Sequence, residues 1–168
     1  MRYFPAAVAL SLLGAVTASI GQAAPHQADP RAVELVAQGK AQLAAGNVQE
    51  AQDSFEAALA VDPAYSAVYL QLAEAARREG LQGKAIHYYQ QALAKEPNNI
   101  VAISGEGEAM VAKGAVAKAK ENLAKLKSIC GDKCGETQQL AAAIAAGPPQ
   151  QKVLTAEAVT PDATVTQK

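Results

Sequence analysis

The most reactive side chains in this sequence are two cysteines, Cys130 and Cys134, with three residues between them. In an exported protein, an even pair at such close spacing is most simply a disulfide, because oxidising compartments preserve such bonds. Free thiols, or a metal or redox activity, are the alternatives. The last of these is the weakest, since the spacing is not C-x-x-C and two thiols cannot complete a tetrahedral zinc site. The sequence therefore predicts a disulfide and no bound cofactor.

The other residues that could take part in catalysis are scattered along the chain. The two histidines are His26, in a polar leader, and His87, within a helical segment. His26 is expected to be a solvated residue of a flexible end, and His87 has no serine, cysteine or carboxylate at a spacing typical of a catalytic triad. The carboxylates of Glu106 and Glu108 form no convincing acid–base pair, and no phosphate-binding or metal-binding motif occurs. We therefore predict that the protein is not an enzyme and holds no metal.

The first residues have the features of an export signal. Arg2 supplies a positive end, residues 5–20 form an uncharged apolar run, and small residues precede a possible cleavage site after Ala23. The run is shorter than the roughly 20 apolar residues that a membrane span needs, although an uncleaved anchor is the alternative. We predict a signal peptide over residues 1–23. The mature chain is then periplasmic or secreted, with no stable membrane insertion.

Composition narrows the class of the mature domain. The chain of 168 residues has room for about one domain, and only 4% of its residues are aromatic. A core built from small side chains favours closely packed helices over a sheet sandwich. The formal net charge of −1 argues against a nucleic-acid-binding protein, because such proteins carry a strong positive excess. The composition predicts an all-α fold with no nucleic-acid partner.

One set of landmark residues occurs twice, at a fixed interval of 34 positions. Such self-similarity indicates a stack of repeated units, each formed by two short helices. A glycine separates the two helices of a unit and a proline follows the second. The landmarks are Gly46, Ala51, Phe55, Ala58, Leu59 and Pro63, which recur as Gly80, Ala85, Tyr89, Ala92, Leu93 and Pro97.

A third, degraded unit follows, so the predicted helical domain spans residues 32–146. Its first helix contains Gly105 and Gly107, each of which costs about 1 kcal/mol of helix propensity relative to alanine. We therefore expect this helix to be the softest. The predicted segments are a flexible leader over 24–31, units over 32–65, 66–99 and 100–131, a capping helix over 136–146 and a disordered tail over 147–168.

The pattern resembles the tetratricopeptide repeat family. The residues that match its motif are Ala51, Phe55, Pro63, Ala85, Tyr89 and Pro97, together with the small residues Gly39 and Gly107. Leu35 stands where the family often has tryptophan, and the third unit lacks both the aromatic residue and the proline. The resemblance implies an all-α, right-handed α-solenoid of about three hairpins, with a C-terminal capping helix over the last apolar surface.

In this family the first helix of each unit lines a concave groove, and the resemblance implies where that groove lies here. Its surface would be mostly small and apolar, with isolated charges, which suits a peptide or helix that presents an apolar ridge. The basic, Asn-rich set with which chaperone-binding members hold a terminal carboxylate is missing. The candidate groove residues are Val36, Lys40, Leu70, Gln71, Glu74, Arg78 and Glu108.

Charge is distributed unevenly along the stack. Residues 31–80 contain four basic and seven acidic residues, whereas residues 113–133 contain six basic and two acidic residues. The basic end could meet an acidic partner, but lysines that keep an outer helix face solvated are the simpler interpretation.

We therefore predict a non-catalytic protein- or peptide-binding scaffold in a bacterial-type cell envelope. The partner and the oligomeric state are left open. The competing hypothesis is a disulfide/redox or metal-handling accessory protein that uses Cys130 and Cys134.

Overall fold

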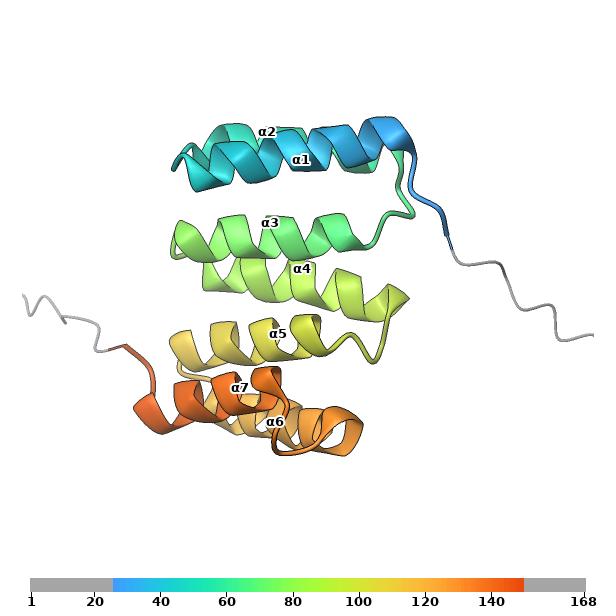
Figure 1. Ribbon diagram of the computed structural model, residues 1–168. Helices are drawn as coiled ribbons and strands as arrows, with labels where there is room; N and C mark the ends of the chain where they lie inside the picture. Colours follow the sequence, from blue (N-terminus) through green and yellow to red (C-terminus); the bar gives the residue numbers. More distant parts are fainter. Residues whose placement is uncertain (1–25, 150–168) are drawn as a thin grey trace, which may run out of the picture.

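The computed structural model describes residues 26–149, and all regular structure in that range is helical. Three antiparallel hairpins, α1–α2, α3–α4 and α5–α6, stack in sequence order, and α7 lies against the last of them (Figure 1). The predicted all-α solenoid of three hairpins and a capping helix is confirmed. The predicted signal peptide and the tail beyond Pro149 lie outside the described residues. The helices are α1 (Pro30–Ala44), α2 (Val48–Val61), α3 (Ala67–Arg78), α4 (Gln82–Lys95), α5 (Ile100–Ala112), α6 (Val116–Cys130) and α7 (Gly135–Ala146).

The repeated glycines end the first helix of each hairpin. Gly46 and Gly80 have φ values of +88° and +75°, a left-handed conformation that other residues adopt at a cost. After α1, the amide of Gly46 donates to the carbonyl of Leu43, and the amide of Asn47 donates to the carbonyl of Gln42. This pair of bonds satisfies the last free carbonyls of the helix and turns the chain sharply toward α2. The same two bonds recur after α3, so the hairpin geometry repeats.

The core is a column of small and aliphatic side chains that passes through all three hairpins. Phe55 and Leu72 are at most 1% exposed and belong to the first cluster, which already includes residues from two hairpins. Tyr89 lies in the second cluster, and Ile103 and Leu140 lie in the third. Since each cluster draws on neighbouring hairpins or on α7, burial of apolar surface depends on stacking.

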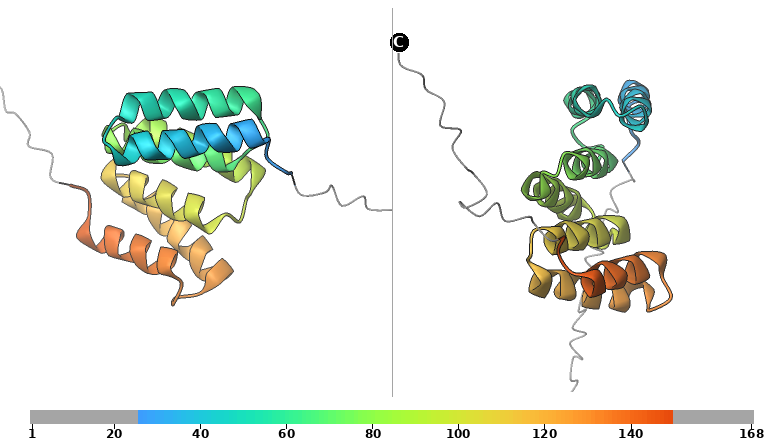
Figure 2. Two further views of the ribbon diagram at one scale, coloured as in Figure 1. Left: turned by 45° about the horizontal axis from the view of Figure 1, so that its top comes forward. Right: turned by 90° about the vertical axis from the view of Figure 1, so that its left-hand side faces the viewer.

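Glycines inside two helices make room for large buried side chains of a neighbouring helix. A Cβ atom at Gly39 would overlap the ring of Phe55. A Cβ atom at Gly107 would lie 2.7 Å from both methyl carbons of Leu140, which projects from α7 and is fully buried. The two views of Figure 2 show α7 lying across the last hairpin, next to α5. The cap is therefore seated on α5 through the space left by Gly107.

Helix α5 is the most enclosed of the seven helices. Nine of its thirteen residues are buried, because it packs against α4, α6 and α7. We expected this helix to be the softest, on the basis of glycine propensity alone. Its packing argues against that expectation, since both Gly105 and Gly107 receive a large side chain from a neighbouring helix. Within the described residues, no helix is long and apolar enough to cross a membrane.

Candidate functional site

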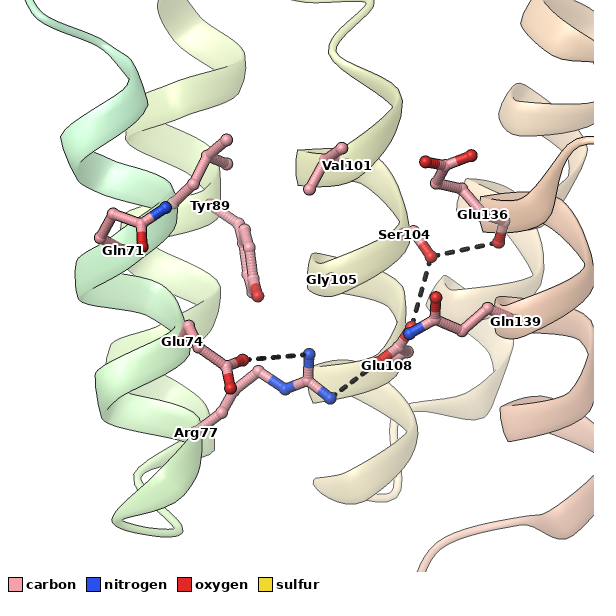
Figure 3. Close-up of a pocket in the computed structure, with 11 residues that line it drawn as sticks. Gln71, Glu74, Arg77, Tyr89, Val101, Ser104, Gly105, Glu108, Glu136 and Gln139 are labelled. Atoms are coloured by element: carbon pink, nitrogen blue, oxygen red, sulfur yellow. Dashed lines mark hydrogen bonds and ion pairs between the residues drawn. The ribbon is translucent and has the colours of Figure 1, made fainter. Parts of the chain in front are cut away.

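A cleft of about 290 Å³ opens on the side of the stack formed by the first helices of the hairpins. It lies between α3 and α5, and the first turns of α7 close one side of it (Figure 3). We call it the Arg77 cleft. Its lining residues are Leu70, Gln71, Glu74, Arg77, Tyr89, Val101, Ser104, Gly105, Glu108, Glu136 and Gln139.

The repeat itself brings side chains from α3 and α5 together. Gln71 and Gly105 are 34 positions apart, as are Glu74 and Glu108, so each pair occupies the same place on successive first helices. Residues three and four apart lie on one face of a helix. The two helices therefore present matching faces to the same opening.

Arg77 connects the two walls of the cleft. Its Nη2 atom lies 2.7 Å from Oε2 of Glu108 on α5, and its Nη1 atom lies 3.8 Å from Oε2 of Glu74 on its own helix. Burial lowers the pKa of Arg77, but Tyr89 and Glu108 outweigh burial and raise that pKa above its ordinary value. The guanidinium is therefore positively charged and is already paired with protein carboxylates, and the Arg77 side chain is 29% exposed.

Tyr89 reaches the cleft from α4 and forms part of its floor. Its ring lies over Gly105, where any Cβ atom would overlap it. The residue is only 4% exposed, and its hydroxyl points into the cleft (Figure 3). Burial raises the pKa of this hydroxyl, and the nearby Arg77 guanidinium opposes the increase without reversing it. Tyr89 therefore presents a neutral hydroxyl near neutral pH.

The capping helix contributes the third wall. The hydroxyl of Ser104 lies 3.1 Å from the backbone carbonyl of Glu136 and 3.4 Å from Oε1 of Glu108. This contact ties the start of α7 to the middle of α5. Glu136 and Gln139 consequently face the same opening as the residues of α3 and α5.

Four of the seven groove residues predicted from the sequence lie together in the Arg77 cleft. These are Leu70, Gln71, Glu74 and Glu108. These four side chains therefore form one surface that a ligand could contact. That they bind a ligand stays a prediction.

The other three predicted groove residues lie outside this cleft. Val36 is 4% exposed and belongs to the first core cluster, so its side chain is not available to a ligand, which corrects the sequence-based placement. Lys40 is exposed on α1, away from the cleft. Arg78 points toward the first hairpin, where its Nη1 donates to the carbonyl of Leu43 at 2.8 Å and its Nε donates to Glu74 at 3.0 Å.

Sequence reasoning missed several residues of the cleft. Arg77 occupies the position that holds Leu43 and Val111 in the other two units, both of them buried. An arginine at a repeat position that holds apolar residues in the other two units could have indicated a functional residue from the sequence alone. Glu136 and Gln139 lie outside the repeat, so no periodicity could place them there.

Cys130 ends α6 and Cys134 precedes α7, and their Cα atoms are 5.7 Å apart. That separation lies within the range of a disulfide. Within residues 26–149, no group of three or more His, Cys, Asp or Glu side chains is arranged to hold a metal ion. His26 lies 2.8 Å from Oδ2 of Asp62, whereas His87 lies beside the ring of Tyr88.

Comparisons with known proteins agree with this architecture. Residues 36–100 match the family model described as tetratricopeptide repeat, and no curated protein matches the chain. The Sgt2 TPR domain from Aspergillus fumigatus is 24% identical, with a TM-score of 0.64 over 75% of this chain and 90% of that one. The first TPR of Spaghetti (RPAP3), bound to the HSP90 peptide SRMEEVD, is 22% identical, with a TM-score of 0.63 over 71% and 95% of the two chains.

A bacterial structure is similar as well. The Yersinia enterocolitica type III secretion chaperone SycD, in complex with a peptide of the translocator YopD, is 21% identical, with a TM-score of 0.59 over 68% of this chain and 86% of that one. Likeness at this level of identity establishes the fold, and the family match establishes the repeat. The chain is a tetratricopeptide repeat protein.

Proposed function

We propose that this protein is a non-catalytic scaffold that binds a peptide segment of a partner protein in the Arg77 cleft. The observation that carries the proposal is the cleft itself, which combines exposed apolar atoms with hydrogen-bonding side chains from four helices. Val101 is 49% exposed at its edge, although large apolar side chains are otherwise mostly buried. Such a surface gives affinity through apolar contact and register through its polar groups.

Similar structures support the same class of activity. Two of them hold a peptide, from HSP90 in one case and from YopD in the other. The peptide SRMEEVD is acidic, whereas three of the four charged residues that line the Arg77 cleft are themselves carboxylates. The partner of this chain therefore differs in chemistry from that peptide.

We also propose that the protein works outside the cytoplasm, in a bacterial-type envelope. The apolar run near the N-terminus and the cysteine pair motivate this proposal. In such a compartment Cys130 and Cys134 form a disulfide that fixes the turn between α6 and α7. Expression of the full chain in a Gram-negative host, followed by intact mass of the periplasmic fraction, tests the proposal: the expected mass lacks residues 1–23, and an uncleaved cytoplasmic product would contradict it.

The competing function, a redox or metal-handling accessory, has less support. It needs a reactive thiol pair or further ligands near the cysteines, and the described part of the chain contains no group of three or more His, Cys, Asp or Glu side chains that could hold a metal ion. The two proposals differ in which residues a partner requires.

Crosslinking and pull-down from envelope extract separate them. The change Val101→Arg places a bulky cation at the edge of the cleft, and Leu81→Arg is the matched control, because Leu81 is 47% exposed and lies outside the cleft. We expect the partner to be lost with Val101→Arg and retained both with Leu81→Arg and with the Cys130→Ser/Cys134→Ser double variant. Loss in the double cysteine variant with retention in Val101→Arg would favour the accessory function instead.

A further inference from the structure

We infer that the Arg77 cleft takes a basic side chain of an extended peptide, with a small apolar residue beside it. This inference rests on the proposed peptide-binding function and specifies the chemistry of the partner. Two observations carry it: the balance of charge in the cleft, and the way this level of the stack differs from the first.

The charge balance favours a cation. The charged groups that line the cleft are three carboxylates, Glu74, Glu108 and Glu136, and one guanidinium, that of Arg77. Arg78, the neighbouring cation, bonds to Glu74 from outside the cleft. Even when Arg78 is counted, one carboxylate remains in excess. An incoming ammonium or guanidinium group would therefore be attracted to the cleft.

The same lining is unfavourable for a ligand that carries a carboxylate. Its natural partner would be Arg77, but that guanidinium is held by Glu108 at 2.7 Å, and the side chain of Glu108 is only 10% exposed. An acidic ligand would either displace Glu108 from Arg77 or place a further carboxylate beside Glu74 and Glu108. Removing one partner of a half-buried pair is costly, so the cleft disfavours acidic peptides.

The hydroxyl of Tyr89 belongs to the polar lining of the cleft. Tyr89 is 4% exposed, and its hydroxyl points into the cleft (Figure 3). The guanidinium of Arg77 interacts with this hydroxyl and opposes the increase in its pKa. The O–H group can still donate a hydrogen bond to a carbonyl of a bound peptide.

The remaining lining suits the rest of a peptide. Leu70 and Val101 offer apolar contact beside the charged groups, and Gln71 and Gln139 offer amide groups from opposite walls. A primary amide can both donate to and accept from a peptide backbone. A basic side chain thus meets the carboxylates that line the cleft, while its small apolar neighbour packs at the edge.

This combination occurs at one level of the stack. The position of Glu74 and Glu108 is held by Lys40 in the first unit, and the position of Arg77 is held there by Leu43. Lys40 would repel a basic ligand, so the first unit lacks the acidic character. The preference is therefore built by the residues that change between repeats, at the junction of the second and third units.

Fluorescence anisotropy with three labelled octapeptides tests the inference on the full mature chain. The peptides are N-acetylated and C-amidated, share the same alanine and leucine positions, and carry lysine, glutamine or glutamate at two central positions. We expect the lysine peptide to bind about fivefold more tightly than the glutamine peptide, and at least about tenfold more tightly than the glutamate peptide. These differences in affinity should become smaller in high salt.

Charge variants should move affinity in opposite directions. Glu108→Gln should weaken binding of the lysine peptide about fivefold, whereas Arg77→Gln, which removes the only cation in the lining, should strengthen it. Glu121→Gln is the matched control, because Glu121 is exposed on α6 outside the cleft, and it should have no effect. Circular dichroism of each variant verifies that it is folded, and opposite shifts cannot come from a common loss of structure.

Two kinds of failure can be distinguished. If all three peptides bind equally, or the glutamate peptide binds best, and Val101→Arg abolishes that binding, the cleft binds peptides but the basic preference is wrong. If none of the three binds at millimolar concentration, or Val101→Arg has no effect, the proposed peptide site itself is wrong.

Discussion

Replacing Gly107 by alanine tests whether the capping helix is seated on α5 as described. The new Cβ atom would lie 2.7 Å from both methyl carbons of Leu140, which is fully buried. Overpacking of this kind costs about 1–3 kcal/mol, and the gain in helix propensity offsets about 1 kcal/mol. We expect Gly107→Ala to lower the free energy of unfolding by about 1 kcal/mol.

The same substitution should have the opposite effect once Leu140 is shortened. Leu140→Ala alone removes a fully buried side chain and should cost about 2–5 kcal/mol. In that background the clash at Gly107 is gone, so Gly107→Ala should raise the free energy of unfolding by about 1 kcal/mol through helix propensity. The double-mutant cycle should therefore show a coupling of about 2 kcal/mol between the two sites.

Urea unfolding followed by circular dichroism measures all four proteins. The slopes of the transitions show whether unfolding stays two-state, which the comparison requires. A Gly107→Ala effect of the same sign and size in both backgrounds would refute the seating of α7 on α5. It would also remove the argument that Glu136 and Gln139 form a wall of the cleft.

Three further predictions concern other parts of the fold. Glu106→Ala should destabilise the protein by about 1–3 kcal/mol in urea melts, since this buried carboxylate accepts bonds from side chains of α4 and α6 that would be left unpaired. A hydrogen bond from the backbone amide of Asp29, and then one from His26, lowers the pKa of Asp62. The ionised Asp62 carboxylate therefore stabilises the fold above its ordinary pKa of 3.8, and this stabilisation is lost as pH falls through the lower pKa of the folded state. Asp62→Asn should make the fall of Tm with decreasing pH shallower over that range, and an unchanged slope would contradict this. Alkylation without reductant should label neither Cys130 nor Cys134, and their double replacement by serine should cost about 1–3 kcal/mol; two labelled thiols would rule out the bridge.

The stacked architecture could be predicted from the sequence because its signals are local and repeated. Gly46 and Gly80 mark the ends of first helices, and their positive φ values explain why glycine recurs there. The 34-residue interval also placed Phe55 and Tyr89 in the core. What the interval could not give is the direction of each ring: the ring of Phe55 packs on Gly39 in its own hairpin, whereas that of Tyr89 packs on Gly105 of the next one.

The candidate site was predicted in part for the same reason. Glu74 and Glu108 occupy equivalent positions on successive first helices, and Gln71 lies three residues before Glu74 on the same helix face, so periodicity alone brings the three side chains together. Arg77 was missed because its position holds apolar, buried residues in the other units, and its role depends on an ion pair that crosses between helices. The wall formed by Glu136 could not be placed, because it depends on how α7 docks rather than on the repeat.

Propensity alone was misleading for α5. Gly105 and Gly107 weaken an isolated helix, yet in the stack each leaves space for a buried side chain from a neighbouring helix. Tertiary packing therefore reverses the local expectation, and the enclosed position of α5 makes it the centre of the C-terminal half of the fold.

The central claim, that a peptide binds in the Arg77 cleft, is tested most directly by NMR. Amide spectra of the ¹⁵N-labelled mature chain are recorded during titration with the lysine octapeptide, and the shifts are mapped on the structure. We expect the largest shifts at Gln71, Ser104 and Gln139, which come from three different helices and meet only at this cleft. Shifts concentrated on the lysines of α6, such as Lys118 and Lys120, or no saturable shifts at all, would contradict the account.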